Sequence, residues 1–321
     1  MHIGPEWFAP QRKRMVRVSD GEYLAVWDQG GSGVPILLVH GFPQNHLCWM
    51  QVLPQLALPT QPVRCIAYDL RGHGESSKRG EASWQRLFQD QLDLVAALRL
   101  DRYHHVGHDW GGAIGLHVSR YHPESLRSLV VLNTNYWKTD IGGMWHMLLL
   151  NLPIIAPLCF RLAPGRMFDT FITQSHMEHT RVDASVMDSY QKAFKDRATT
   201  AYWIRLYRNM VKGLLRQAVP RFLKSALKTS AVALPRTSED AFRTPTLLIW
   251  GAQDAFNPVP VGRVIEKRLR GYGTAVRFEL IADSKHFVPE DQPGPVGRLI
   301  AEHVKGIRDS RVNVPQPVHA D

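Results

Sequence analysis

The stretch Gly107-His108-Asp109-Trp110-Gly111 decides how this chain of 321 residues folds. It follows an apolar strand pattern at 103–106 and begins a helical pattern that runs to about residue 121. A nucleophile elbow has the form small-x-nucleophile-x-small, because the turn from strand to helix is too tight for side chains at the flanking positions. Glycine occupies both flanking positions here, and the central residue is an aspartate. We therefore predict an elbow with Asp109 as its nucleophile.

Asp109 also has a simpler interpretation, as the N-cap of the helix. Aspartate just before a helix is common and stabilising, because its carboxylate accepts hydrogen bonds from free backbone N–H groups. A cap alone would require neither glycine at both flanking positions nor the third glycine, Gly112. We favour the nucleophile and keep the N-cap as the alternative.

Strand and helix patterns alternate on both sides of the elbow. Strands are predicted at 15–19, 23–27, 36–39, 63–68, 103–106, 129–132, 246–250 and 276–281. Helices are predicted at 84–99, 110–121, 261–270 and 295–305. Several strands are uninterrupted apolar runs, which is typical of strands buried on both faces. The pattern predicts an α/β fold with a mostly parallel central sheet and helices on both faces.

The alternation stops near residue 135 and resumes near residue 243. The segment 136–242 has helical patterns, is rich in Trp, Tyr and Met, and shows no convincing strand. The simplest organisation is one α/β core, residues 15–135 and 243–308, interrupted by a helical cap at 136–242. Residues 1–14 and 309–321 are predicted to be tails.

An acid and a histidine follow the later strands. Asp254 comes after the strand at 246–250, and His286 comes after the last strand. Like Asp109, both then lie beyond the carboxyl ends of strands, where α/β sheets place their sites. Asp283 is a competing acid, although it lies close to His286 in sequence, and a plain turn residue is the alternative for Asp254. We predict a nucleophile, acid and histidine triad in this chain order.

An aspartate nucleophile implies a particular chemistry. Its carboxylate is ionised at neutral pH, so no base is needed to activate it. It can displace a leaving group at a saturated carbon, and water activated by the histidine must then hydrolyse the resulting ester. Hydrolysis needs oxyanion donors, for which we predict the backbone N–H groups of Phe42 and Trp110. Pro43 has no N–H group and would stiffen this loop, and we predict it as a substrate contact.

Composition and charge limit the partners. The chain is 44% hydrophobic, enough for a large core, and carries a formal net charge of +10. Its Lys and Arg are scattered without a nucleic-acid motif, so we expect no nucleic-acid partner and at most a peripheral membrane contact. The apolar, charge-free run 144–160 is too short for a spanning helix of about 20 residues and contains Pro153 and Pro157. We predict it to be the wall of an apolar pocket.

The number and pattern of the cysteines indicate the cellular compartment. Cys48, Cys65 and Cys159 are an odd number without a pairing pattern, which is typical of buried free thiols in a reducing environment. The N-terminal residues form no apolar secretory signal. We therefore expect a cytoplasmic protein. No ligand pattern for a metal or a cofactor occurs, so we expect neither.

Four stretches resemble a known family. They are His40-Gly41-Phe42-Pro43, residues 68–76, Gly107-His108-Asp109-Trp110-Gly111-Gly112 and Trp250-Gly251-Ala252-Gln253-Asp254. Over nearly all of residues 15–305 the chain is similar to α/β-hydrolases of the epoxide hydrolase and haloalkane dehalogenase group. This resemblance implies the α/β-hydrolase fold and an Asp nucleophile. Its core motifs do not separate the two activities, so the cap must decide.

In the cap, Tyr207 resembles the tyrosine with which epoxide hydrolases polarise the epoxide. Ring opening creates an alkoxide, and a Tyr O–H group is a suitable donor for it. The alternative for Tyr207 is an aromatic residue of the cap interior. Epoxide hydrolases usually have a second cap tyrosine, but none occurs between Trp137 and Asp188. We predict His146 as the second donor and Trp145, next to it, as a substrate contact.

The resemblance implies a hydrolase that converts hydrophobic epoxides to diols with water, for detoxification. The alternative is a haloalkane dehalogenase with the same triad and Trp110 as halide donor, although many dehalogenases carry Asn where Phe42 stands. Dehalogenases of fluorinated acids pair two arginines where this chain has Trp110 and Ala113. The aspartate nucleophile argues against a lipase-type esterase, and the intact triad argues against a binding protein on a hydrolase scaffold.

Overall fold

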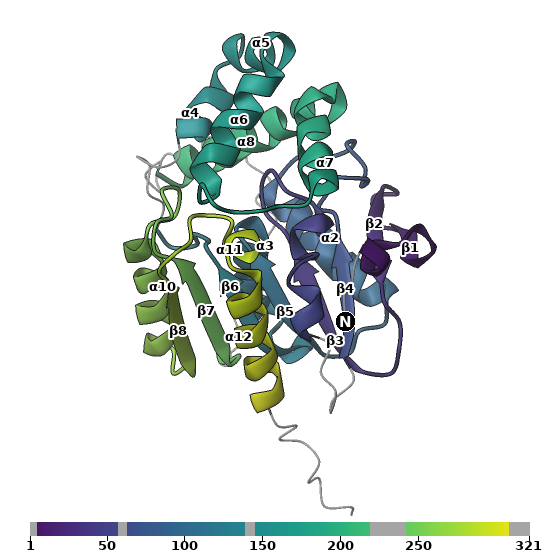
Figure 1. Cartoon of the computed structure of the whole chain (residues 1–321), viewed down its shortest axis with the longest axis vertical. Coiled ribbons are helices and arrows are strands. Elements are labelled where there is room, and N and C mark those ends of the chain that lie inside the picture. The colour runs from purple at the N-terminus through teal and green to yellow at the C-terminus, as the bar shows by residue number, and fades with distance from the viewer. Residues whose placement is uncertain (1–4, 57–62, 139–144, 219–241, 308–321) are drawn as a thin grey trace, which may run out of the picture.

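An eight-stranded sheet forms the centre of the molecule (Figure 1). The computed structural model describes residues 5–56, 63–138, 145–218 and 242–307. The strand order is β1-β2-β4-β3-β5-β6-β7-β8; β2 runs antiparallel to β1 and β4, and the other pairs are parallel. The strands are β1 Lys13–Arg17, β2 Tyr23–Asp28, β3 Val34–Val39, β4 Val63–Tyr68, β5 Tyr103–His108, β6 Leu126–Leu132, β7 Thr246–Gly251 and β8 Val276–Ile281. The predicted mostly parallel sheet is confirmed.

Helices cover both faces of the sheet, because successive strand residues point to opposite sides. In β7, Leu248 and Trp250 pack in one apolar cluster with α3 and α10, while Leu247 and Ile249 belong to the cluster that contains α12 residues. The α-helices of the core are α1 Leu53–Leu56, α2 Trp84–Ala97, α3 Trp110–Tyr121, α10 Val259–Gly271, α11 Val288–Asp291 and α12 Pro293–Gly306. Four 3-10 helices complete the core: η1 Pro5–Phe8, η2 Pro10–Arg12, η3 His46–Trp49 and η4 Pro123–Ser125.

Among the described residues, five helices form an insertion between β6 and β7. They are α4 Trp145–Asn151, α5 Ile155–Leu162, α6 Pro164–Ser175, α7 Ala184–Lys195 and α8 Arg197–Ala218. Figure 1 shows them stacked over one end of the sheet, teal to green, as a cap. The α/β-hydrolase fold with an inserted helical cap is therefore confirmed. The exact boundaries of the cap stay a prediction, since residues 139–144 and 219–241 lie outside the described residues.

The N-terminal segment corrects one prediction. Residues 5–14 are not a tail: they form two 3-10 helices and the start of β1. Phe8 packs edge-on against Trp27 and His46, with ring centroids 6.2 and 4.8 Å apart, which anchors the segment to the core. The second predicted tail, 309–321, lies outside the described residues.

The charge-free run 144–160 was predicted to be the wall of an apolar pocket, and most of it is not. Of its described residues, only His146 and Met147 line the cavity between the cap and the elbow that contains Asp109. Leu148 and Ile154 are 65% and 77% exposed, so much of the run forms an outer surface of the cap. No single described helix is long and apolar enough to cross a membrane; α4 and α5 pass that test only as a pair, and they meet at a bend of 102°.

Candidate active site

The turn between β5 and α3 is the predicted elbow. Asp109 has a φ of 48°, a strained value for a residue other than glycine. Cβ atoms on Gly107 and Gly111 would lie 2.2 Å from the Gly111 oxygen and 2.1 Å from the Val39 oxygen, so only glycine fits. The Asp109 side chain makes no capping hydrogen bond, although the residue occupies the N-cap position. The N-cap alternative is therefore wrong, and the strain is typical of a functional residue.

The Asp109 carboxylate is buried against two backbone N–H groups. Its Oδ2 accepts a hydrogen bond from the N–H of Phe42 at 2.9 Å, and the nearby N–H of Trp110 also favours the ionised carboxylate. Burial raises the pKa of Asp109, while His286 and the two N–H groups oppose that increase. The residues predicted to supply the oxyanion hole thus already contact the carboxylate. Gly41 permits this approach, since a Cβ there would lie 2.4 Å from Asp109 Cβ.

His286 and Asp254 lie in the loops after β8 and β7. His286 Nδ1 is 2.9 Å from Asp254 Oδ2, and His286 Nε2 is 3.9 Å from Asp109 Oδ1. Burial disfavours a charge on His286, but the carboxylates of Asp254 and Asp109 outweigh it and raise the pKa of His286. The competing acid, Asp283, is half exposed and pairs with His179 at 2.9 Å. The structure therefore brings together Asp109, Asp254 and His286, and leaves Asp283 outside.

Asp254 is held by donors from three segments. Its Oδ1 accepts from the N–H groups of Phe256 and Asn257, at 2.8 and 3.0 Å, and its Oδ2 accepts from Asn133 Nδ2 at 2.6 Å. Burial would raise the pKa of Asp254, but His286 and these hydrogen bonds lower it. Asp254 thus stays ionised and orients the imidazole. Sequence reasoning missed Asn133, which follows β6 and has a φ of 40°, a value that is favourable for Asn.

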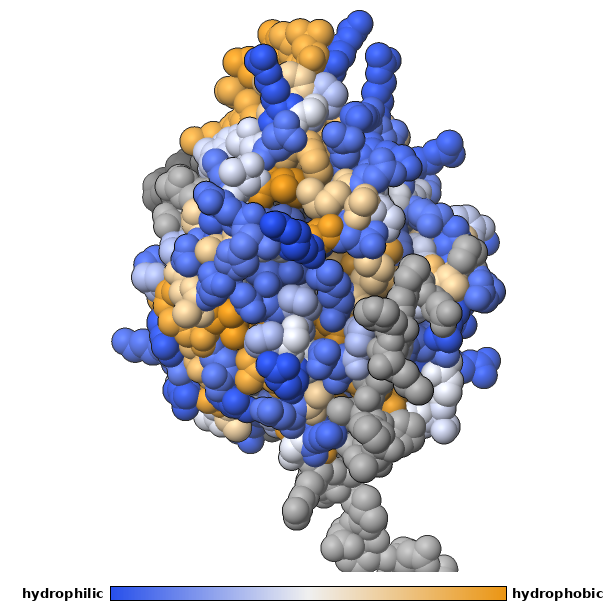
Figure 2. Space-filling view, viewed as in Figure 1, coloured by the Kyte–Doolittle hydropathy of each residue, from blue (hydrophilic) through white to orange (hydrophobic). Residues whose placement is uncertain are grey.

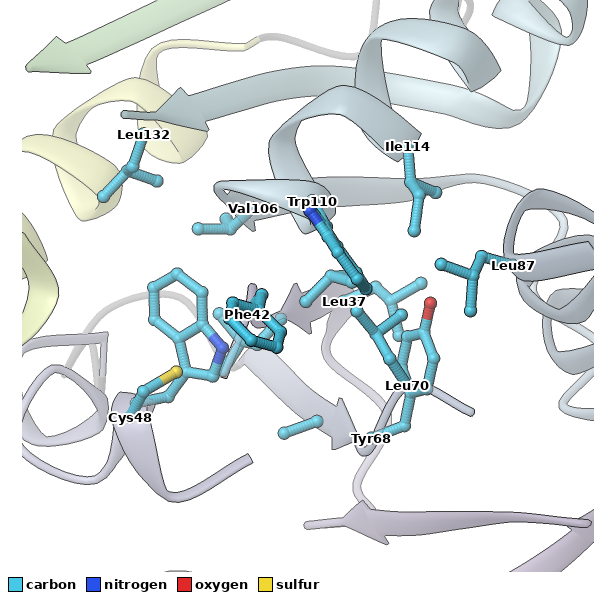
Figure 3. Close-up of a cluster of buried hydrophobic side chains, with 14 of the residues drawn as sticks. Leu37, Phe42, Cys48, Tyr68, Leu70, Leu87, Val106, Trp110, Ile114 and Leu132 are labelled. Atoms are coloured by element: carbon cyan, nitrogen blue, oxygen red, sulfur yellow. The ribbon is translucent and has the colours of Figure 1, made fainter. Parts of the chain in front are cut away.

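A cavity of about 260 Å³ lies between the elbow and the cap. Asp109 and His286 form its reactive side, and aromatic and apolar side chains form much of the rest. Phe42 and Trp110 stack with ring centroids 5.6 Å apart, and Figure 3 shows the two rings among the buried side chains of the core. The wall includes Ala113, Met147, Phe171, Met210 and Phe256. An enclosure of this kind favours small hydrophobic ligands.

Tyr207 and His146 project into this cavity from α8 and α4. Their ring centroids are 5.5 Å apart, and the Tyr207 ring also lies 5.3 Å from that of Trp110. Burial, with the Asp109 carboxylate adding to it, raises the pKa of Tyr207 well above 10, so its O–H keeps the proton. Burial, with His286 adding to it, lowers the pKa of His146 to about 3, so its ring is neutral. Both side chains are therefore uncharged hydrogen-bond donors.

The other predicted substrate contacts are not in the cavity wall. Neither Pro43 nor Trp145 lines the cavity. Trp145 Nε1 donates to Gln174 Oε1 at 2.7 Å, and its ring packs on Phe171 and His146. Trp145 thus supports His146 from behind, because the first turn of α4 directs consecutive residues to different sides of the helix.

Residues 34–293 match the family described as alpha/beta hydrolase fold. The chain belongs to the α/β-hydrolase fold family. Epoxide hydrolase 3 of Xenopus tropicalis is 25% identical to this hydrolase over 283 residues, which cover 84% of this chain and 71% of that protein. Haloalkane dehalogenase 2 of Mycobacterium tuberculosis is 28% identical over 300 residues, 92% of this chain and 93% of that protein. The predicted resemblance to this group is confirmed.

A shorter match adds a relative with a third activity in its name. Fluoroacetate dehalogenase of a Burkholderia species is 40% identical to this α/β-hydrolase over 127 residues, which cover 38% of this chain and 40% of that protein. The three relatives carry different activities in their names. Specificity must therefore be argued from the cavity. Among the described residues, no three His, Cys, Asp or Glu side chains are placed to hold a metal ion.

A buried polar network behind the triad was also missed by sequence reasoning. His108 Nε2 lies 2.9 Å from the carbonyl oxygen of His286, and His108 Nδ1 lies 2.9 Å from Gln44 Oε1. Gln44 Nε2 donates to Glu290 Oε2 at 2.7 Å. The hydrolase thus connects the loop of His286 to α11 through two side chains from β5 and the loop after β3. Only His108 had a sequence signal, its place beside the nucleophile.

Proposed function

We propose that this hydrolase opens hydrophobic epoxides to diols through a covalent ester on Asp109. The observation that carries the proposal is the position of Tyr207. Its buried ring lies in the cavity wall near Asp109, and its raised pKa keeps the O–H group protonated. An epoxide is a poor electrophile until its oxygen receives a hydrogen bond or a proton, and Tyr207 is suited to supply one.

In the first step, Asp109 attacks the epoxide. The N–H of Phe42 occupies Oδ2, so Oδ1 is the oxygen left to attack. A bond forms between Oδ1 and an epoxide carbon, and the carbon–oxygen bond of the ring breaks. The oxygen keeps the electron pair and takes the proton of Tyr207, while the neutral ring of His146 offers a second donor. The product is an ester with a free hydroxyl on the neighbouring carbon.

In the second step, His286 activates water for attack on the ester carbonyl carbon. The imidazole takes one proton from water, and Asp254, 2.9 Å away, stabilises the imidazolium. The charge that develops on Oδ2 is stabilised by the N–H groups of Phe42 and Trp110, which already contact this carboxylate. His286 returns its proton to the departing diol oxygen. The other water proton restores the Tyr207 O–H, and Asp109 is again a carboxylate.

A haloalkane dehalogenase remains the second candidate, because Trp110 lines the cavity next to the nucleophile. A halide leaves without a proton and needs weak donors in an apolar surrounding. Phe42, the other residue of the hole, contributes an apolar ring to the cavity wall and has no side-chain N–H group. Two uncharged donors, Tyr207 and His146, lie in the cavity instead. This pair favours the epoxide.

Tyr207→Phe tests the substrate class. The change removes one donor that acts mainly in the transition state, so alkylation of Asp109 by an aromatic epoxide should slow about 10²- to 10³-fold. Alkylation by a bromoalkane, if it occurs, should change little. The measurement is the rate of adduct formation for both substrates by rapid quench and intact-protein mass spectrometry.

Tyr202→Phe is the matched control. Tyr202 lies on the same helix, but its O–H donates to the Glu81 carbonyl at 3.0 Å and it does not line the cavity. This variant should keep the wild-type rates. If Tyr207→Phe slows both substrates equally, or if the wild type reacts only with the bromoalkane, the epoxide assignment is wrong.

A further inference from the structure

The outer surface of α4 and α5 carries a concentrated group of exposed apolar side chains. Of the ten exposed large hydrophobic side chains in the described part of the chain, six lie within residues 148–162. We call them the apolar tip: Leu148, Leu152, Ile154, Ile155, Leu158 and Leu162. Figure 2 shows hydrophobic residues gathered at the top of the molecule, where Figure 1 places α5. Single exposed hydrophobic residues are ordinary, whereas a contiguous group marks an interaction surface.

The same helices bury their other faces within the cap. His146 and Leu150 of α4, and Ala156 and Phe160 of α5, are buried. The side chains of the apolar tip are therefore not needed for packing inside the cap, because other residues of these helices already fill its interior. It is the outward face of helices that are apolar on both sides.

Cations border the apolar tip along the sequence of α5, α6 and α8. The sequence from Trp145 to Phe168 contains no acidic residue, and neither does the sequence of α8, which packs against α4 and α5. Arg161 and Arg166 are exposed beside the tip in sequence. Arg208 of α8 donates from Nη2 to the Leu152 carbonyl at 3.2 Å, which holds a cation next to the tip. The whole chain carries +10. An apolar surface bordered by cations is complementary to an anionic bilayer surface.

We propose that the apolar tip docks this protein on anionic lipid bilayers. The tip lies in the interface and does not span the membrane, because α4 and α5 meet at 102° and their buried faces hold the cap together. Docking itself does not depend on the proposed reaction. The position does have a consequence for substrate: Met147, the neighbour of Leu148, lines the cavity. The apolar tip and the cavity wall thus share helix α4, so a docked protein would hold this wall close to the bilayer, which concentrates hydrophobic molecules.

Flotation of the full chain with vesicles tests the docking. The wild type should float with vesicles of phosphatidylglycerol and phosphatidylcholine at about 0.15 M salt, and several-fold less with phosphatidylcholine alone. Ile154→Ser with Leu158→Ser removes two side chains from the tip and should lower the bound-to-free ratio about tenfold or more. Arg161→Gln with Arg166→Gln should remove most of the preference for the anionic vesicles.

Met15→Ser with Leu280→Ser is the matched control. These two residues are 47% and 46% exposed, like Leu158 at 47%, but lie on strands of the core. This pair should float like the wild type. Equal urea midpoints would show that each variant is folded.

Three results would overturn the proposal. The wild type could fail to float with anionic vesicles, or the Ile154 and Leu158 pair could float as well as the wild type. The third is a dimer in light scattering that the same pair converts to monomer without vesicle binding, which would make the tip an interface between two copies of the chain. Turnover of a water-soluble substrate should be unchanged in the tip variants, since neither residue lines the cavity.

Discussion

At the residue scale, two opposing effects act on the pKa of His286. Burial disfavours its protonation, yet Asp254 and Asp109 raise its pKa above the ordinary value of 6.5. The proposed water activation needs a neutral imidazole, because only the neutral ring accepts a proton. In the ester Asp109 is uncharged, so Asp254 is the main carboxylate that still raises the pKa of His286. Ester hydrolysis should be fast above that pKa and slow as pH falls through it. Attack by Asp109 needs only its carboxylate, so alkylation should persist at lower pH until the pH falls through the pKa of Asp109, which burial raises.

The expected outcome is that the alkyl-enzyme ester accumulates as pH decreases. Intact-protein mass spectrometry of the wild type, quenched during turnover of an epoxide between about pH 5 and 9, would measure the fraction of adduct. His286→Gln removes the base and should accumulate the adduct at every pH. An adduct fraction in the wild type that does not change with pH, or an adduct on a residue other than Asp109, would contradict the assignment.

At the element scale, a buried ion pair connects the loop after β4 to α2. Arg71 is fully buried and donates to both oxygens of Asp90, from Nε and Nη2, at 2.7 Å each. Asp90→Ala would remove the bidentate partner of this guanidinium and leave Asp20, 3.0 Å from Nη2, as its remaining carboxylate. A buried charge without any partner typically costs about 3–5 kcal/mol, so the loss of unfolding free energy should approach but not exceed this range. Urea denaturation measures the loss. The loop concerned, residues 69–76, carries one of the family motifs.

Asp188→Ala is the surface control for that prediction. Asp188 and Lys192 form an ion pair on α7 at 2.6 Å, but both side chains are more than half exposed. Pairs of this kind contribute little, because water and salt screen them. Equal changes in the two variants would show that burial does not set the contribution of Asp90.

At the scale of the whole molecule, Glu290 joins the core to the cap. Its carboxylate accepts hydrogen bonds from Gln44 in the core, from Tyr190 of α7 at 2.8 Å and from His176 after α6 at 3.0 Å. Glu290→Ala leaves these buried groups without their partner, each at about 1–3 kcal/mol. We expect a lower unfolding free energy and faster amide hydrogen exchange in α6 and α7 than in the central strands.

Two variants sharpen this prediction. Glu290→Gln keeps the shape and one acceptor oxygen, so it should lose less stability than Glu290→Ala. Glu124→Ala should change neither quantity, because the Glu124 side chain is 70% exposed. Uniform acceleration of exchange over the whole chain would mean that Glu290 stabilises the fold generally and does not join its two parts.

Much of the fold could be predicted from the sequence, because its signals are local. The observed α3, Trp110–Tyr121, has the predicted bounds, since Gly107 marks the turn before it and Pro123 follows it. The strands β4 and β8 also have their predicted bounds, and the other predicted core elements differ by one to three residues at their ends. The short helices α1 and α11 were not predicted. The local signals are the period of the hydrophobic pattern, glycine at tight turns and proline after helices. Each of them acts over only a few residues. The chain order of Asp109, Asp254 and His286 can likewise be read directly from the sequence.

Tertiary structure alone decided which side chains meet. Asn133 donates a hydrogen bond to Asp254, and Gln44 and Tyr190 donate to Glu290. The partners in each pair are 100 residues or more apart in the sequence. Nothing local distinguishes these residues from other polar ones. The same holds for the cap, where one apolar run supplies both a cavity wall and the exposed apolar tip. The helices packed around a helix determine which of its faces is buried. When a helix is apolar on both faces, its own sequence does not indicate which face that will be.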